Sequence, residues 1–304
     1  MSGRQFYDRP YLLLSVTMLL WSGNLIVGRA VHADLPPIGL AFWRWFMAFL
    51  VVLLFARRHL RADWPALRAR SGRLFLLSLL GIAAFNTLVY TGLHDTTAIN
   101  TVVLQAIMPV VILAVSFLLY RDTLSLRQTA GIGVSLLGVL LMVARGDPAL
   151  LAALRLNPGD GLILLAVLAY AFYSVLLRGA PAVHPMSFLA ATFGLGAAIL
   201  APMHAAEWLS GAPMVFDRTA FLSVAYVALF PSILAYFCFN RGVALIGANR
   251  AGPMLHLVPV FTSALAITLL GETLAWFHLA GFAVILTGIW LASRQAPAAA
   301  GDGA

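Results

Sequence analysis

A helix-breaking proline occurs twice in this chain, each time inside an apolar stretch long enough to cross a lipid bilayer. Residues 104–124 read LQAIMPVVILAVSFLLYRDTL, and residues 254–274 read MLHLVPVFTSALAITLLGETL. A shift of 150 positions places Pro109 on Pro259 and Asp122 on Glu272. Because proline removes a backbone donor and clashes with the preceding turn, we predict that both stretches are broken helices. The chain therefore carries the same interrupted helix in two places.

The composition requires a membrane for most of the chain. Hydrophobic residues make up 62% of the sequence and charged residues 10%, whereas a soluble domain is about 25% charged. A spanning helix needs about 20 mainly apolar residues. We predict ten such helices, at residues 11–31, 36–56, 74–93, 98–119, 125–144, 160–178, 185–204, 219–239, 247–270 and 275–293.

The arginines predict how the chain lies in the membrane. The chain contains arginine but no lysine. If the N-terminus is cytoplasmic, only Arg145, Arg155 and Arg218 lie in loops on the opposite side. This asymmetry follows the positive-inside rule, so we expect a multi-pass protein of the bacterial inner membrane with both termini cytoplasmic. The same rule explains the net charge of +8 without a nucleic-acid partner.

The repeat extends over nearly the whole chain. A shift of 149 or 150 aligns glycines, aromatic residues and amides of the two halves: Gly131 with Gly281, Gly138 with Gly288, Asn86 with Tyr236, Tyr90 with Asn240, Trp21 with Tyr170, and Asn24 with Tyr173. Each half holds five predicted spans, and an odd number means that the second half enters the membrane inverted. We predict an all-α membrane protein of ten transmembrane helices in two inverted five-helix repeats, the plan of many secondary transporters.

These repeats give the predicted domain organisation. Residues 1–10 form a cytoplasmic segment, residues 11–145 the first repeat, residues 146–159 a connecting loop, residues 160–293 the second repeat, and residues 294–304 a disordered cytoplasmic tail.

Several motifs resemble one transporter family. They are LLWSGNLIVGRA at residues 19–30, FWRW at residues 42–45, the two proline-containing stretches that end in YRDTL and LGETL, and the glycine-rich stretches GIGVSLLGVLLMV and GFAVILTGIWLAS. With these motifs the chain resembles the ten-helix EamA-type members of the drug/metabolite transporter superfamily, and among them the YddG-like aromatic amino-acid exporters. The resemblance covers residues 11–293. It implies export of amino acids and other small metabolites.

The candidate site residues are polar and aromatic side chains inside the spans. We expect Trp21, Tyr90, Tyr170 and Tyr173 to form the walls of a cavity, and Asn24, Asn86, Gln105, Tyr236 and His256 to offer hydrogen bonds to a solute. Pro109 and Pro259 are the candidate gating hinges. The alternative is that these groups only join helices, since interhelical hydrogen bonds stabilise membrane bundles by about 0.6 kcal/mol each.

Arg44 is a charge within a predicted span, flanked by two tryptophans. An ionisable residue at such a depth indicates function by default, and here it is the candidate contact for a substrate carboxylate. The alternative is that Arg44 extends its long side chain outward to the membrane surface, and the sequence slightly favours this structural role. Trp43, Trp45 and Trp276 suit the aromatic belt at the membrane interface.

Acidic residues are informative by their positions. All eleven Asp and Glu residues fall in loops or at the ends of predicted spans, so no span interior offers the carboxylate that proton-coupled drug exporters need. A cationic drug is thereby disfavoured as the substrate. Coupling to protons would fall to His256. We see no motif for a cofactor, a metal site or an intramembrane catalytic centre, and we expect no enzyme.

We therefore expect an alternating-access transporter that exports small neutral or zwitterionic metabolites by facilitated diffusion. Amino acids, aromatic and other neutral ones, are the first candidates. Export itself is implied by the family resemblance. The alternatives are a proton-coupled exporter of other small metabolites or drugs, and a passive metabolite channel. The expected partners are a small-molecule substrate and the lipid bilayer, with the protein a monomer or a weak homodimer.

Overall fold

The computed structural model describes residues 6–31, 35–123, 125–271 and 273–293. Within these ranges the chain has ten helical segments long and apolar enough to cross a membrane, as predicted. The first repeat comprises α2 (Pro10–Val31), α3 (Pro37–Ala69), α4 (Ser71–Leu77), η1 (Ser78–Ala84), α5 (Phe85–Asp95), α6 (Ala98–Ala106), α7 (Met108–Tyr120) and α8 (Leu126–Val143). The connecting segment contains α9 (Pro148–Ala152).

The second repeat follows the same plan. It comprises α10 (Pro158–Leu176), η2 (Leu177–Gly179), α11 (Pro185–Leu209), α12 (Arg218–Ala228), η3 (Leu229–Leu234), α13 (Ala235–Ile246), α14 (Ala248–Ala251), η4 (Gly252–His256), α15 (Leu257–Leu270) and α16 (Trp276–Ser293). The start of α2 and the end of α16 lie at the same face, where the Tyr11 hydroxyl donates to the Ser293 carbonyl at 3.4 Å.

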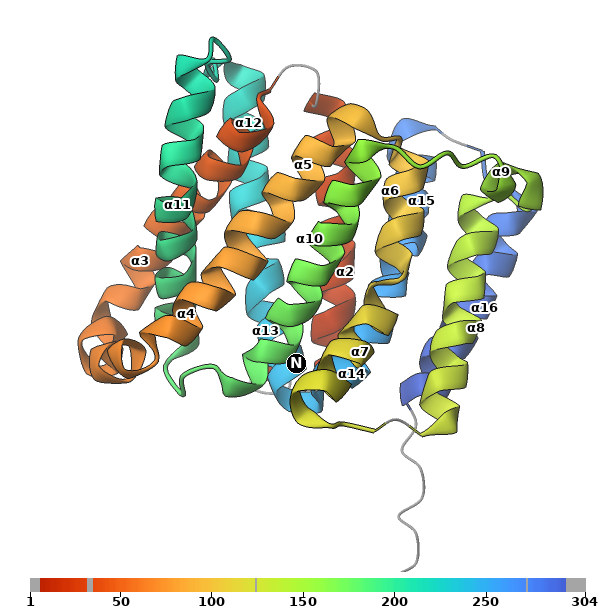
Figure 1. The fold of residues 1–304 in the computed structure, drawn as a ribbon, viewed down its shortest axis with the longest axis horizontal. Helices are drawn as coiled ribbons and strands as arrows, with labels where there is room; N and C mark the ends of the chain where they lie inside the picture. The colour runs from red at the N-terminus through yellow and green to blue at the C-terminus, as the bar shows by residue number, and fades with distance from the viewer. Residues whose placement is uncertain (1–5, 32–34, 124, 272, 294–304) are drawn as a thin grey trace, which may run out of the picture.

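The two halves pack into each other. The first helix of each repeat contacts the third and fourth spans of the other: α2 packs on α13 and α15, and α10 packs on α5 and α7 (Figure 1). The main hydrophobic core accordingly contains residues of both halves, such as Met18 of α2 and Val167 of α10. The two inverted five-helix repeats are thus a structural fact, and they share one core.

The pair α8 and α16 stands at one edge of the molecule (Figure 1). Their glycines allow close backbone contact, as small residues do between membrane helices. A Cβ atom built on Gly131 would lie 2.5 Å from the backbone nitrogen of Ala292 and 2.7 Å from the Gly288 carbonyl oxygen. These glycines, which the repeat aligns in the sequence, therefore serve contact within one chain.

Both prolines interrupt their helices. Helix α6 ends at Ala106, and α7 begins at Met108 with Pro109 in its first turn. In the second repeat the 3-10 segment η4 ends at His256. Helix α15 begins at the next residue, Leu257, with Pro259 in its first turn. The predicted interruptions are present, and a gating role for them stays a prediction.

Two further distortions are repeat-related. The π-helical segments η1 and η3 occupy equivalent places in the third span of each half, since 150 added to the bounds of η1 gives 228–234. Such wide turns offset the backbone hydrogen bonds and often mark functional sites. Each half thus has two irregular spans, and all four lie beside the first helix of the other half.

Helix α3 is longer than predicted. The sequence predicts an end at residue 56, whereas the helix continues to Ala69. The extension, residues 57–69, is RRHLRADWPALRA, and its charges do not disfavour helix once the chain has left the apolar core. The predicted helix stopped at residue 56 because the run of apolar residues stops there. Glu272 and the tail at residues 294–304 lie outside the described residues.

Gly131→Ala is expected to lower the thermal stability of the protein in detergent. The new methyl group would meet backbone atoms of α16, and overpacking of this kind costs about 1–3 kcal/mol. Gly133→Ala is the matched control on the same helix, because a Cβ there meets nothing within 4 Å. Equal unfolding temperatures for the two variants would contradict the close α8–α16 contact.

Candidate functional site

Arg44 lies at the centre of a polar cluster built by both repeats. Its side chain is 1% exposed. The Nε atom donates to the Ser232 hydroxyl at 2.6 Å, and Nη2 donates to the Pro231 carbonyl at 3.2 Å. The expectation that Arg44 reaches outward to the membrane surface is wrong, because its guanidinium finds its acceptors inside the bundle.

The Nη1 atom of Arg44 has more acceptors than it has protons. It lies 3.2 Å from Asn24 Oδ1, 3.1 Å from Asn86 Oδ1 and 3.0 Å from the Tyr90 hydroxyl. Guanidinium Nη1 carries two N–H groups, so these three acceptors share two protons. Asn24 and Tyr90 are partly exposed, while Asn86 is buried. A solute group could therefore take the place of Asn24 or Tyr90 without disturbing the buried contacts.

The charge of Arg44 has no acidic counterpart among the described residues. Its five partners are hydroxyl, amide and carbonyl groups, all neutral. Two described arginines elsewhere do have carboxylates: Arg178 pairs with Asp122, and Arg241 pairs with Asp8. Charges inside a membrane protein normally pair with one another or with backbone carbonyls. The centre thus presents a hydrogen-bonded but electrically uncompensated cation.

The irregular turn η3 explains why Ser232 and Pro231 can serve Arg44. Pro231 lacks an N–H and cannot bond to the carbonyl four residues back, that of Val227. The Ser232 hydroxyl donates to the Val227 carbonyl instead, at 2.7 Å. The Pro231 carbonyl accepts from both Arg44 and the Trp21 indole, the latter at 3.1 Å. The break in the helix is therefore what creates the acceptors.

Aromatic side chains form a layer next to this cluster. Trp21 lies 5.6 Å from Tyr170 and 6.0 Å from Tyr236 between ring centroids, and Tyr173 lies 5.9 Å from Tyr236. These distances are typical of favourable aromatic pairs. Phe239, which the sequence did not single out, lies 5.2 Å from Trp21. The four predicted aromatic residues Trp21, Tyr170, Tyr173 and Tyr236 are therefore brought together.

Trp45 also belongs to the interior. It is fully buried, with its ring 5.1 Å from Tyr236 and 4.9 Å from Phe193. The assignment of Trp45 to the interfacial belt is wrong, because the helix turns this residue toward the bundle. Trp276, in contrast, is 62% exposed.

A second polar group, related to the first by the repeat, lies beside the same aromatic layer. The Tyr236 hydroxyl donates to the Gly81 carbonyl at 2.6 Å, and Gly81 is the repeat equivalent of Pro231. The Tyr173 hydroxyl donates to Asn240 Oδ1 at 2.8 Å. Both acceptor carbonyls, of Gly81 and Pro231, lie in the π-helical segments. The inverted repeat thus provides each π-helical carbonyl, of Gly81 and Pro231, with side-chain donors from the other half.

A wide cavity approaches this second group from the face that carries the chain ends. Its volume is about 1200 Å³, and its lining includes Tyr7, Ser174, Arg178, Asn240 and Arg241. We call this cavity the vestibule. Because Asn240 lines it and also bonds to Tyr173, the vestibule reaches the residue that holds the Tyr173 hydroxyl.

His256 lies apart from this centre, in packed protein. It is 1% exposed, its Nε2 atom donates to the Ala106 carbonyl at 2.9 Å, and its Nδ1 atom lies 2.7 Å from the Ser135 hydroxyl. We expected a position facing a wet cavity, whereas both nitrogens are bonded to protein. Ala106 is the repeat equivalent of His256, so this contact joins the two interrupted helices. Gln105 is partly exposed, and within the described residues its side chain has no hydrogen-bond partner.

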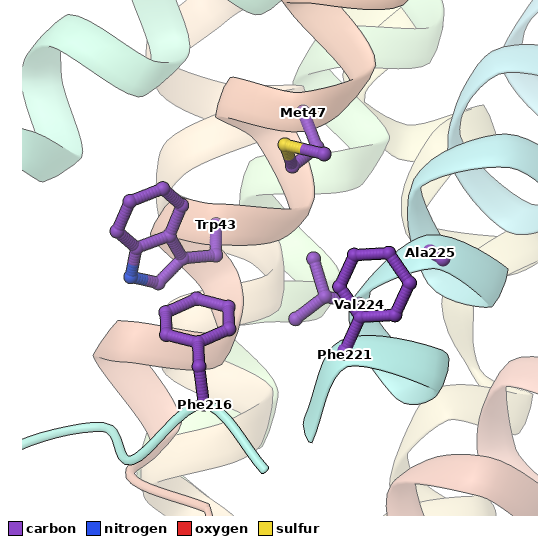
Figure 2. Close-up of a pocket in the computed structure, with 6 residues that line it drawn as sticks. All are labelled: Trp43, Met47, Phe216, Phe221, Val224 and Ala225. Carbon is purple, nitrogen blue, oxygen red and sulfur yellow. The ribbon is translucent and has the colours of Figure 1, made fainter. Parts of the chain in front are cut away.

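A smaller pocket of about 290 Å³ lies between α3 and α12 (Figure 2). It is lined by Trp43, Met47, Phe216, Phe221, Val224 and Ala225. Its walls are apolar, so it offers no group that could orient a polar solute. Among the described residues no group of three or more His, Cys, Asp or Glu side chains could hold a metal ion.

Tyr173→Phe and Tyr170→Phe form a matched pair on one helix. Both residues are buried, but the Tyr170 hydroxyl has no hydrogen-bond partner in the described part of the chain. Tyr173→Phe is expected to lower stability by about 0.6–1.7 kcal/mol, because it removes the bond to Asn240. Tyr170→Phe is expected to leave stability unchanged. Thermal unfolding in detergent measures both, and an equal loss in the two variants would show that the Tyr173–Asn240 bond contributes nothing.

Comparison with known proteins agrees with this architecture. The model of the EamA-like transporter family matches twice, at residues 9–144 and 157–294. A relative from Bacillus subtilis, the uncharacterized transporter YyaM, is 26% identical over 290 residues, which is 93% of each chain. The probable amino-acid metabolite efflux pump of Salmonella typhimurium is 25% identical over 92% of this chain and 93% of its own.

A solved crystal structure has a similar fold. It superposes with a TM-score of 0.75 over 93% of this chain and 96% of its own, at 18% sequence identity. This likeness concerns the fold alone. With the double match of the family model to both repeats, the chain belongs to the EamA-like transporter family and is a multi-pass membrane transporter.

Proposed function

We propose that the protein is an alternating-access exporter of small metabolites that carry a carboxylate group, a class that includes the amino acids. The observation that carries the proposal is the buried guanidinium of Arg44, which has neutral partners from both repeats and an aromatic layer beside it. Arginine recognises carboxylates through paired N–H groups. The site lies where such transporters bind solute, at the interface of the repeats.

The hydrogen-bond inventory of Arg44 leaves room for a carboxylate. Nη2 carries two N–H groups and has one recorded acceptor, the Pro231 carbonyl. Nη1 has three acceptors, and two of these side chains, Asn24 and Tyr90, are partly exposed. A carboxylate that bridges Nη1 and Nη2 would use the spare proton and displace one neutral acceptor. The unpartnered Tyr170 hydroxyl is a further candidate contact.

The arrangement of the vestibule supports a carrier more than a channel. Asn240 lines the vestibule and bonds to Tyr173, whereas Arg44 does not line it and is 1% exposed. A channel would need a continuous wet path, whereas here Arg44 is closed off from the vestibule. We infer that the vestibule is the cytoplasmic mouth and that both termini are cytoplasmic, in the inner membrane, because arginines gather on that side. Pro109 and Pro259 would allow the opposite mouth to open in turn.

The name of one relative supports two further parts of the proposal, that transport is outward and that the solutes resemble amino acids. The Salmonella relative is named an amino-acid metabolite efflux pump, which favours efflux of amino-acid-like solutes. The absence of acidic residues from the contacts of Arg44, among the described residues, favours facilitated movement over proton exchange. The same absence disfavours catalysis within the membrane.

Arg44→Met is expected to reduce saturable uptake of a labelled carboxylate solute by about tenfold or more, because a hydrogen bond to a charged group contributes about 1.5–3 kcal/mol. Arg44→Lys keeps the charge but loses the paired geometry, so an intermediate rate is expected. Purified protein in liposomes, with solute on both sides to test trans-stimulation, provides the measurement. Unfolding temperatures separate misfolding from loss of binding. Wild-type rates in a folded Arg44→Met protein would refute the proposed site.

His256→Ala is expected to keep uptake that needs no pH gradient and to lower the unfolding temperature. The substitution removes the bonds to Ala106 and Ser135, which hold interrupted helices together. Uptake measured with and without an imposed pH gradient decides the point. A wild-type rate that requires the gradient and vanishes in His256→Ala would make this histidine the proton carrier and favour the proton-coupled alternative.

A further inference from the structure

The positive charge of the Arg44 cluster restricts the net charge of the solute that it can bind. Membership of the family does not by itself set this restriction. Arg44 is a cation, and no described acidic side chain contacts it; three of them have partners elsewhere, Asp160 with Asn100, Glu207 with the N-terminus of α3, and Asp122 with Arg178. A carboxylate bound to Arg44 would neutralise the centre. A solute with an additional positive group would leave the centre positive.

An α-ammonium group would also find both π-helical carbonyls of the centre already engaged. The Pro231 carbonyl accepts from both Arg44 and Trp21, and the Gly81 carbonyl accepts from Tyr236. An ammonium group next to a guanidinium is repelled by it, and this repulsion is strong where water is excluded. Aromatic faces of Trp21 and Tyr236 give an ammonium group only a weak substitute for a carboxylate. The centre therefore suits an anion better than a zwitterion.

The vestibule has the same electrostatic preference. The charged side chains in its lining are four arginines and one aspartate: Arg121, Arg178, Arg241, Arg250 and Asp122. Arg178 pairs with Asp122 and Arg241 with Asp8, which leaves an excess of positive charge. A recess lined by one sign of charge raises the local concentration of solutes of the opposite sign. Anions would be collected at this mouth and zwitterions would not.

We propose that the transported species is a net monoanion, a carboxylate whose α-position bears a hydroxyl, oxo or acylated amino group in place of a free ammonium. This inference rests on the proposed function, since it assumes that Arg44 binds the solute carboxylate. Facilitated passage of a monoanion moves one negative charge. The inside-negative potential of a bacterial membrane therefore drives such a solute outward, without any coupled ion.

The test uses two solutes that differ in one group. Phenyllactate and phenylalanine have the same skeleton, with a hydroxyl in the first where the second has an ammonium group. Wild-type protein in liposomes is given each labelled solute, with an inside-positive potassium diffusion potential set by valinomycin. Phenyllactate is expected to accumulate about tenfold at a potential of about 60 mV, and phenylalanine is expected to show no response to it. Protein-free liposomes measure the leak.

Asn24→Asp supplies the missing acid. Asn24 is partly exposed and already contacts Arg44 Nη1, so an aspartate there would neutralise the guanidinium and offer an acceptor to an ammonium group. The variant is expected to reverse the preference, with about a tenfold gain for phenylalanine relative to phenyllactate. Asn24→Ser, which adds no charge, is the control.

The possible outcomes distinguish this inference from the proposed function. Saturable transport of phenylalanine at a rate equal to or above that of phenyllactate, with no accumulation of either under the potential, would overturn the monoanion assignment and leave the carboxylate site intact. Transport of neither solute above protein-free liposomes, by protein with a normal unfolding temperature, would refute the proposed carboxylate site together with the inference.

Discussion

Every backbone polar group inside a bilayer must find a partner within the protein, and four irregular spans make this requirement acute here. The partners come largely from the opposite repeat. The Ser22 hydroxyl of α2 donates to the Val258 carbonyl next to Pro259, and Tyr236 donates to the Gly81 carbonyl in η1. His256 donates to the carbonyl of Ala106, where α6 ends. Each half is therefore held together by side chains of the other.

At Arg44 this exchange of partners between the halves produces the proposed solute-binding group as well as stability. Pro231 removes a donor from its own helix, Ser232 replaces that donor, and the widened turn presents acceptors to the guanidinium. Neutral acceptors solvate the cation but leave its charge. In the proposed site the structural network and the solute contacts are the same atoms, so a solute that competed for them would act directly on the contact between the halves. That coupling is what an alternating-access transporter needs.

The helices and the repeat could be predicted because hydrophobicity and proline act locally. Apolar runs of spanning length, an odd number of spans in each half, and Pro109 and Pro259 at a fixed shift lead to the fold without any knowledge of contacts. The same reasoning missed Ser232, Pro231 and Gly81, although Gly81 and Pro231 stand 150 positions apart. Small or apolar residues give no polar signal, and their carbonyls become acceptors only through the π-helical turns.

The sequence by itself determined the ten spans, the inverted repeat and the aromatic and amide residues that gather between the halves, because these depend on composition and periodicity along the chain. Only the tertiary structure decided which way the long side chains point. It turned Arg44 inward to five neutral acceptors, buried Trp45, and enclosed His256 between two broken helices. The physical reason is that solvation of a polar group in a membrane is supplied by distant segments, so its cost and its partners are not readable from neighbours in sequence.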